Sequence, residues 1–364
     1  MNIKAKSFLI DICSIKDIVI KAILLLVFWC VVIYLEEKNP DWFGYQRLFE
    51  DGAWLAESGR DYGFLLIIKI FKLFFGNNYL LFRRITYVVF SIIIWLFLSK
   101  KFLISKTKES DTLLFSIAFI PLFFLRYTMQ IREGFAISFV IFALNAMFKS
   151  FEEERPLTSL THLKIFIFLL IASSIHSGVS FFLGFYIFSL LLGKFKIGNS
   201  LDNLFKSISL FLFYLLLVYF TIDYFYNIKD SYYTGGIVII QLTFSKIIYW
   251  IILGFIIAWL IKLNRLYLKQ HTTNKILQIF IKNVFCLLLL VFYCIGFWFV
   301  MTQFSNSIVS AISRILSLTL CLNIFILSKL SPENRKVIYS ISLFLFVDQI
   351  RILIDSLTYN GFIY

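Results

Sequence analysis

Long apolar stretches, separated by short polar ones, dominate the pattern along the chain. A membrane-spanning helix needs about 17–25 mostly apolar residues, and the pattern predicts about eleven such spans. The predicted spans are Ile18–Leu35, Tyr79–Leu98, Thr112–Tyr127, Gly134–Phe148, Leu163–Ile175, Gly178–Leu192, Leu204–Ile222, Phe244–Lys262, Ile276–Met301, Ile308–Leu327 and Val337–Ile354. We therefore expect an all-α integral membrane protein, a polytopic helical bundle that forms one domain over residues 1–364.

The segment Gly63–Phe75 is apolar but too short to span a membrane. Lys69 and Lys72 follow each other at helical spacing, beside large apolar residues. This pattern is typical of a helix that lies in the membrane interface, with its lysine ammonium groups reaching toward water. A re-entrant segment is the alternative interpretation.

Composition and charge support a membrane protein. Hydrophobic residues make up 60% of the chain and charged residues only 15%, so the apolar surface exceeds what one soluble core hides. The net charge is +14, but the Lys and Arg residues form short clusters between the apolar runs rather than one basic face. This argues against nucleic acid as a partner. Most of them fall on one side of the membrane if the N-terminus is cytoplasmic and the C-terminus outside.

Cysteine spacing gives no sign of a metal site. None of the five cysteines forms a CxxC pair or another metal-like spacing, so we expect no metal, no disulfide and no cofactor. The first apolar run has no small-residue cleavage pattern, and we interpret it as a retained span rather than a signal peptide.

Two predicted outer loops, residues 36–62 and 223–243, combine carboxylates with aromatic rings. Aromatic rings stack on the apolar faces of sugars, and carboxylates accept hydrogen bonds from hydroxyl groups. The candidate sugar-binding residues are Asp41, Tyr45, Asp61, Tyr232 and Tyr233. An interfacial aromatic belt, which needs no ligand, explains the same rings equally well.

Charged groups within or at the ends of spans are the most informative feature. Such groups are costly in a membrane and are usually functional or paired. In the predicted topology they gather toward the outer face: Arg83, Arg84, Arg126, Arg132, Glu133, His176, Arg314, Asp348 and Arg351. The planar guanidinium fork suits a diphosphate, which makes five of these arginines candidate diphosphate ligands: Arg126, Arg132, Arg314, Arg83 and Arg84. The alternative for Arg126 and Arg132 is contact with lipid headgroups.

His176 lies in a turn between two short spans, in the sequence Ser-Ser-Ile-His-Ser-Gly. An imidazole exchanges protons near neutral pH, which suits activation of a sugar hydroxyl. The alternative is a structural histidine bonded to Ser173 or Ser180. We place His176, Arg132 and Glu133 in the catalytic group, with Glu133 as the rival base or as a simple partner of an arginine.

These residues carry a resemblance to a known family. The ordered features are Asp41-Trp-Phe-Gly-Tyr45, Asp-Tyr-Gly-Phe at 61–64, Ile-Arg-Glu-Gly-Phe-Ala-Ile-Ser at 131–138, His-Ser-Gly at 176–178 and the late Arg314. The chain resembles the EpsG-like group of polysaccharide polymerases, which includes many Wzy-type O-antigen polymerases. It departs from the common pattern at Glu133, where many members have Gln, and at Gly178, where Ala is usual.

The resemblance implies a GT-C-like glycosyltransferase of the bacterial inner membrane. Its substrates would be undecaprenyl-diphosphate-linked oligosaccharides, joined at the periplasmic face without a metal or nucleotide sugar, and a chain-length regulator protein would be a further partner besides membrane lipids. Three rivals stay open: an O-antigen ligase, a lipid-linked oligosaccharide flippase, and a sugar acyltransferase. The last needs a His–Asp pair, and no aspartate lies near His176 in the sequence.

Overall fold

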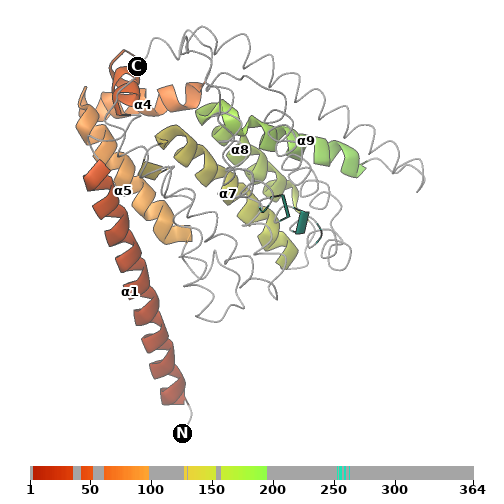
Figure 1. Cartoon of the computed structure of the whole chain (residues 1–364). Helices are drawn as coiled ribbons and strands as arrows, with labels where there is room; N and C mark the ends of the chain where they lie inside the picture. Colours follow the sequence, from red (N-terminus) through yellow and green to blue (C-terminus); the bar gives the residue numbers. More distant parts are fainter. Residues whose placement is uncertain are drawn as a thin grey trace. The chain divides into compact units, whose positions relative to one another are not determined.

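The structure, a computed structural model, describes residues 3–35, 42–51, 61–97, 127–128, 130–152 and 157–194, with a few isolated positions between 252 and 262. Figure 1 shows it as a set of helices. They are α1 (Ile3–Leu35), α2 (Trp42–Asp51), α4 (Tyr62–Phe75), α5 (Tyr79–Phe97), α7 (Ile131–Glu152), α8 (Ser159–Ile175), the 3-10 turn η1 (Ser177–Val179) and α9 (Ser180–Lys194). These residues include no strand, which confirms the all-α class for the part of the chain described.

Five of the eleven predicted spans coincide with described helices. The predicted Tyr79–Leu98 span matches α5 to within one residue, whereas α1, α7 and α8 extend beyond their predicted ends. Hydropathy finds the apolar middle of a helix, but the polar turns that flank it are helical too. By length and composition α5 is the one described helix able to cross a membrane, and residues 18–34, 159–175 and 177–187 form shorter apolar helices. The spans predicted from Leu204 onward, and most of Thr112–Tyr127, lie outside the described residues.

The described helices divide into two compact units. The first holds α1, α2, α4, α5, the part of α7 up to Ala146, and residues Leu163–Ser180. The second holds the end of α7, the start of α8 up to His162, and α9 from Phe181. In the second unit His162 Nδ1 lies 2.7 Å from the hydroxyl of the buried Tyr186. The expectation of a single domain stays a prediction.

In the first unit, ring contacts fix the direction of α1 against α5. The ring of Phe28 packs edge-on against Tyr87, and the Lys21 ammonium lies over the ring of Trp95. Later residues of α1 therefore meet earlier residues of α5, so the two helices are antiparallel. The end of α1 and the start of α5 lie at the same end of this unit.

Helices α7 and α8 share that arrangement. Phe90 contacts Phe135 and Phe97 contacts Phe142, so α7 runs parallel to α5. The start of α7 and the end of α8 both contact Asp61, as described below, so α8 runs back toward the same end. We call this end, where α1 and α8 finish and α5 and α7 begin, the site end.

Helix α4 lies crosswise to α5 (Figure 1). One of its faces is buried in the protein, through Phe64, Leu65, Ile68 and Phe71. The opposite face is exposed and also apolar, with side chains at Leu66, Ile70, Leu73 and Phe74. A short helix with one apolar face toward protein and another toward solvent fits the predicted interfacial segment.

Helix α2 lies within the predicted outer loop 36–62, for which no helix was predicted. Tyr45, Leu48 and Phe49 have helical spacing, and all three are buried in the described unit. Lys72 of α4 donates to the Glu50 carbonyl oxygen at 3.3 Å and lies over the Phe49 ring. This lysine therefore binds the last turn of α2, where a cation is favoured, instead of reaching only toward water.

Gly63 marks the closest approach of α4 to α8. A Cβ at Gly63 would lie 2.4 Å from Ser174 Oγ, 2.9 Å from the Ser174 carbonyl carbon and 3.0 Å from the Ile175 nitrogen. Two of these atoms belong to backbone and cannot rotate away. We expect Gly63→Ala to lower the free energy of unfolding by about 1–3 kcal/mol.

Thermal unfolding in detergent tests this expectation, with Gly44→Ala as the matched control. A Cβ at Gly44, inside α2, meets no atom within 4 Å. The control should therefore be neutral or stabilising by at most about 1 kcal/mol, since alanine reduces the entropy of the unfolded chain. Equal melting temperatures for the two variants would contradict the close approach.

Candidate functional site

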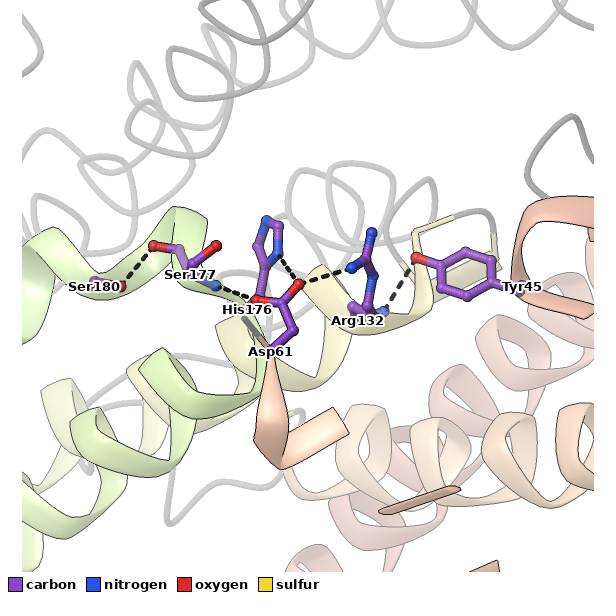
Figure 2. A network of polar contacts seen from close by, with 6 residues as sticks. All are labelled: Tyr45, Asp61, Arg132, His176, Ser177 and Ser180. Carbon is purple, nitrogen blue, oxygen red and sulfur yellow. Dashed lines mark hydrogen bonds and ion pairs between the residues drawn. The ribbon is translucent and has the colours of Figure 1, made fainter. Parts of the chain in front are cut away.

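Asp61 connects three segments that are far apart in the sequence. Its Oδ2 accepts a hydrogen bond from Arg132 Nη1 at 2.7 Å, and its Oδ1 accepts one from the Ser177 backbone N–H at 2.7 Å. His176 Nδ1 lies 3.7 Å from the same Oδ2. Figure 2 shows the carboxylate between the imidazole and the guanidinium. We call Asp61, Arg132 and His176 the charged cluster; all three belong to the first unit.

The backbone of Asp61 is unusual. Its φ of 52° places it in the left-handed region, which aspartate tolerates better than most residues do. Its carbonyl oxygen accepts the N–H groups of Phe64 and Leu65 and so begins α4, but its side chain does not cap that helix. The carboxylate is directed to Arg132 and Ser177 instead. Residues held in such sparsely populated conformations concentrate at functional sites.

Arg132 is the second residue of α7. Its backbone N–H points out of the first helical turn, where it has no partner within the helix, and donates to the Tyr45 hydroxyl at 3.4 Å. Its guanidinium carbon lies 5.8 Å from the centre of the Tyr45 ring. Helix α2 therefore supports Arg132 from one side while Asp61 binds it from another.

His176 occupies the turn between α8 and η1. Its backbone is extended, and its N–H donates to the Ala172 carbonyl oxygen at 3.0 Å, which closes the last turn of α8. The ring presents Nδ1 to Asp61, whereas Nε2 lies beside Gly178, where an added Cβ would come within 2.7 Å of it. The absent side chain at Gly178 leaves space next to Nε2.

Exposure separates the three members of the charged cluster. The side chains of Arg132 and His176 are 23% and 27% exposed, and that of Asp61 is 5% exposed. The guanidinium and the imidazole project in the same direction, on either side of the carboxylate (Figure 2). A ligand that reaches the cluster would therefore meet a fixed cation and an imidazole, with the carboxylate behind them.

The pKa of Asp61 reflects these neighbours. Burial alone would raise the pKa of this carboxyl group. The His176 imidazole, the Arg132 guanidinium and the Ser177 N–H together outweigh burial and hold the pKa below its ordinary value of 3.8. The ionised form is thus the one that the folded protein stabilises.

This lowered pKa predicts a pH dependence of stability. A carboxyl group with a depressed pKa contributes stability that is present above its ordinary pKa and is lost as the pH falls through the folded value. We expect the melting temperature of wild type to exceed that of Asp61→Asn at about pH 6, and the difference to shrink toward about pH 3. Thermal unfolding of both proteins across this range is the measurement. A difference that stays constant with pH would contradict an ionised, paired Asp61.

Arg83 and Arg84 do not act as a pair. Arg83 is 0% exposed, whereas Arg84 is exposed on α5. Adjacent helical residues point about 100° apart, so the two side chains face different surroundings. A fully buried guanidinium cannot reach a substrate in this structure, so Arg83 does not fit its predicted role as a diphosphate ligand.

The other predicted residues have different outcomes. The side chain of Glu133 is only 6% exposed and lies in the first turn of α7, where the helix dipole favours a carboxylate; its role as a base or as the partner of an arginine stays a prediction. The side chain of Tyr45 is only 8% exposed and supports Arg132, so little of its ring is available to stack on a sugar. The remaining predicted residues lie outside the described ones: Asp41, Arg126, Tyr232, Tyr233 and Arg314.

The absence of an aspartate near His176, inferred from the sequence, is wrong in three dimensions. Asp61 lies 3.7 Å from the ring although 115 positions separate the two residues in the chain. The predicted alternative bonds of His176 to Ser173 or Ser180 do not form: Ser173 Oγ donates to Leu169 and Ser180 Oγ to Ser177. One sequence signal for Asp61 was present, namely an aspartate directly before the apolar helix at 62–75.

Within the described residues, no group of three or more His, Cys, Asp or Glu side chains is placed to hold a metal ion. The expectation that the reaction needs no metal stays a prediction. No family model, curated protein or solved structure matches the chain.

Proposed function

We propose that the chain is a polytopic membrane glycosyltransferase that polymerises undecaprenyl-diphosphate-linked oligosaccharide units at the periplasmic face of the bacterial inner membrane. The observation that carries this proposal is the charged cluster, in which Asp61 holds an arginine and a histidine side by side. Those two groups are what transfer from a diphosphate leaving group to a hydroxyl requires.

The reaction joins an acceptor hydroxyl to the anomeric carbon of the donor sugar. The bond from that carbon to the phosphate oxygen breaks as the new glycosidic bond forms, and the hydroxyl proton passes to His176 Nε2. Asp61 lies 3.7 Å from Nδ1 and orients the ring for this task. The proton then leaves with the lipid diphosphate.

Arg132 acts on the leaving group. Negative charge grows on the diphosphate as its bond to the sugar breaks, and a fixed cation there stabilises the transition state more than the ground state. The bond to Asp61 keeps the guanidinium in place before substrate arrives. Its planar fork can still donate to phosphate oxygens through its partly exposed side.

The position of the cluster supports an outward-facing site. It lies at the site end of the first unit, beyond the last residue of α8 and at the second residue of α7. With a cytoplasmic N-terminus, α1 ends on the outer side of the membrane, and so does the cluster. The exposed apolar face of α4 next to it suits contact with the lipid of the substrate.

The deciding experiment gives purified protein in nanodiscs only the undecaprenyl-diphosphate-linked repeat unit of its own strain. A ladder of longer lipid-linked glycans is expected from wild type and not from His176→Ala. Arg47→Ala is the control, because that α2 arginine is 81% exposed and distant in role from the cluster. Failure of wild type to extend an intact substrate would overturn polymerisation; addition of lipid A core would then test ligation, and movement across the bilayer would test a flippase.

Acyl transfer to a sugar is a second candidate, and the His176–Asp61 pair favours it. In that reaction the imidazole removes a proton from the sugar hydroxyl, which attacks the acyl carbon of a thioester and releases a thiol. Arg132 has no leaving diphosphate to stabilise in this chemistry. Transfer of radiolabelled acetyl groups from acetyl-CoA to the lipid-linked glycan, without a ladder, would favour this candidate over polymerisation.

A further inference from the structure

Arg83 is enclosed by neutral groups. Its Nη1 donates to the Tyr79 hydroxyl at 3.3 Å, and its Nη2 donates to the Tyr87 hydroxyl and to the Thr128 carbonyl oxygen, the latter at 3.4 Å. Its guanidinium carbon also lies 4.7 Å from the centre of the Trp42 ring and 5.1 Å from that of Tyr87. We call these four residues, Trp42, Tyr79, Tyr87 and Thr128, the arginine box.

A buried cation among neutral partners is expensive. Aromatic faces and hydroxyl groups offset only part of the cost of removing a guanidinium from water. Charges that persist inside a membrane protein usually serve its function. Because Arg83 is 0% exposed, that function cannot be direct contact with a substrate in this structure.

The arginine box connects the two segments that hold Arg132 in place, namely helix α2 and the residues just before α7. Thr128 precedes Arg132 by four residues, and its carbonyl oxygen accepts from both Arg83 and the Tyr87 hydroxyl. Trp42 lies one turn before Tyr45 on α2, and the Tyr45 hydroxyl accepts the backbone N–H of Arg132. The Tyr79 hydroxyl in turn donates to the Trp42 carbonyl oxygen at 3.1 Å. Arg83 thus ties α5 to both segments that place Arg132.

We propose that Arg83 is a positioning residue that holds α2 and Thr128, four residues before Arg132, so that the Arg132 guanidinium reaches Asp61. The predicted effect of Arg83 on the rate of glycosyl transfer rests on the proposed function, whereas its predicted effect on the Asp61–Arg132 pair does not. Arg83→Ala removes one of the two donors to the Thr128 carbonyl oxygen and leaves only the Tyr87 hydroxyl on it, which lets the first turn of α7 shift. Displacements of about 1 Å at a catalytic group can cost on the order of a hundredfold in rate.

The first test is chemical rescue. Arg83→Ala should lower kcat on the order of a hundredfold with little change in KM. Guanidinium chloride at low millimolar concentration should restore much of the loss, since the ion fills the arginine box, and equal NaCl should not. Arg83→Lys should rescue poorly because an ammonium cannot serve two hydroxyls and a carbonyl with a planar fork. Wild-type kcat in Arg83→Ala would overturn the proposal.

The second test separates positioning from general stability, and it needs no substrate. If Arg83 places Arg132 on Asp61, Arg83→Ala should remove the Arg132 contribution to the ionised Asp61 and leave those of His176 and Ser177. In that background Asp61→Asn should therefore cause a smaller pH-dependent loss of stability than it does in wild type. A pH-dependent difference as large as in wild type would show that the pair forms without Arg83, and would overturn the proposal. Should wild type make no polymer, this test still decides the role of Arg83 and leaves only the proposed function in question.

Discussion

Replacing Arg132 by alanine is expected to abolish the glycan ladder while leaving the protein folded. In the proposed reaction the substitution removes the cation that meets the leaving diphosphate, and loss of one such group typically costs on the order of 10²–10³ in kcat. It also leaves the Asp61 carboxylate, 5% exposed, without its 2.7 Å partner. Freed from Arg132, that carboxylate no longer holds its position beside His176, so the loss should exceed that of a simple phosphate contact.

Product ladders, protein level and separate values of kcat and KM together test this prediction. Arg132→Lys keeps the charge but not the planar fork, so it cannot serve Asp61 and a phosphate with the same geometry, and we expect intermediate activity. Arg47→Ala removes an exposed arginine of α2 and should give a full ladder. A normal ladder from Arg132→Ala at normal protein level would refute the role; a rise in KM alone would reduce Arg132 to a ground-state anchor.

The helices were largely predictable because their signal is local. Apolar residues predominate at 79–97 and 159–175, and both stretches are helical in the structure. The misplaced ends of α1 and α7 are polar turns, which a helix continues through because each added residue gains a backbone hydrogen bond. Helix α2 lies inside the predicted outer loop 36–62, where acidic and aromatic residues obscured the helical spacing of Tyr45, Leu48 and Phe49.

The site was only partly predictable because its geometry depends on contacts across the fold. Charge in an apolar setting singled out both Arg83 and Arg132, and nothing in the sequence distinguishes a buried cation in an aromatic box from one bound to a carboxylate. Asp61 was predicted only as a sugar-binding residue, and that role stays a prediction. Its central position follows from the left-handed turn before α4 and the close packing at Gly63, neither of which a sequence displays.

Asp61→Asn is the second substitution with a large expected effect. Asparagine preserves the size of the side chain, and its amide oxygen can still accept the Ser177 N–H. Its amide nitrogen would then face the Arg132 guanidinium. Both groups are hydrogen-bond donors, so the bond that Arg132 donates to the carboxylate is lost. Arg132 loses its anchor and His176 loses the group that orients its ring. Since general acid–base catalysis contributes about 10²–10⁴-fold, we expect a loss in kcat of that order.

Additivity distinguishes this role from a contribution of Asp61 to sugar binding. Suppose that Asp61 acts only through its two neighbours. The residual activity of an Arg132→Ala, His176→Ala double variant should then fall little further when Asp61→Asn is added. If Asp61 instead binds the sugar, Asp61→Asn should lower the activity of the double variant by the same factor as that of wild type, and it should raise KM. Asp51→Asn provides the matched control, because that carboxylate is 65% exposed at the end of α2 and should leave the ladder unchanged. The outcome decides whether the buried carboxylate or the exposed cation and imidazole define the substrate-facing surface of the cluster.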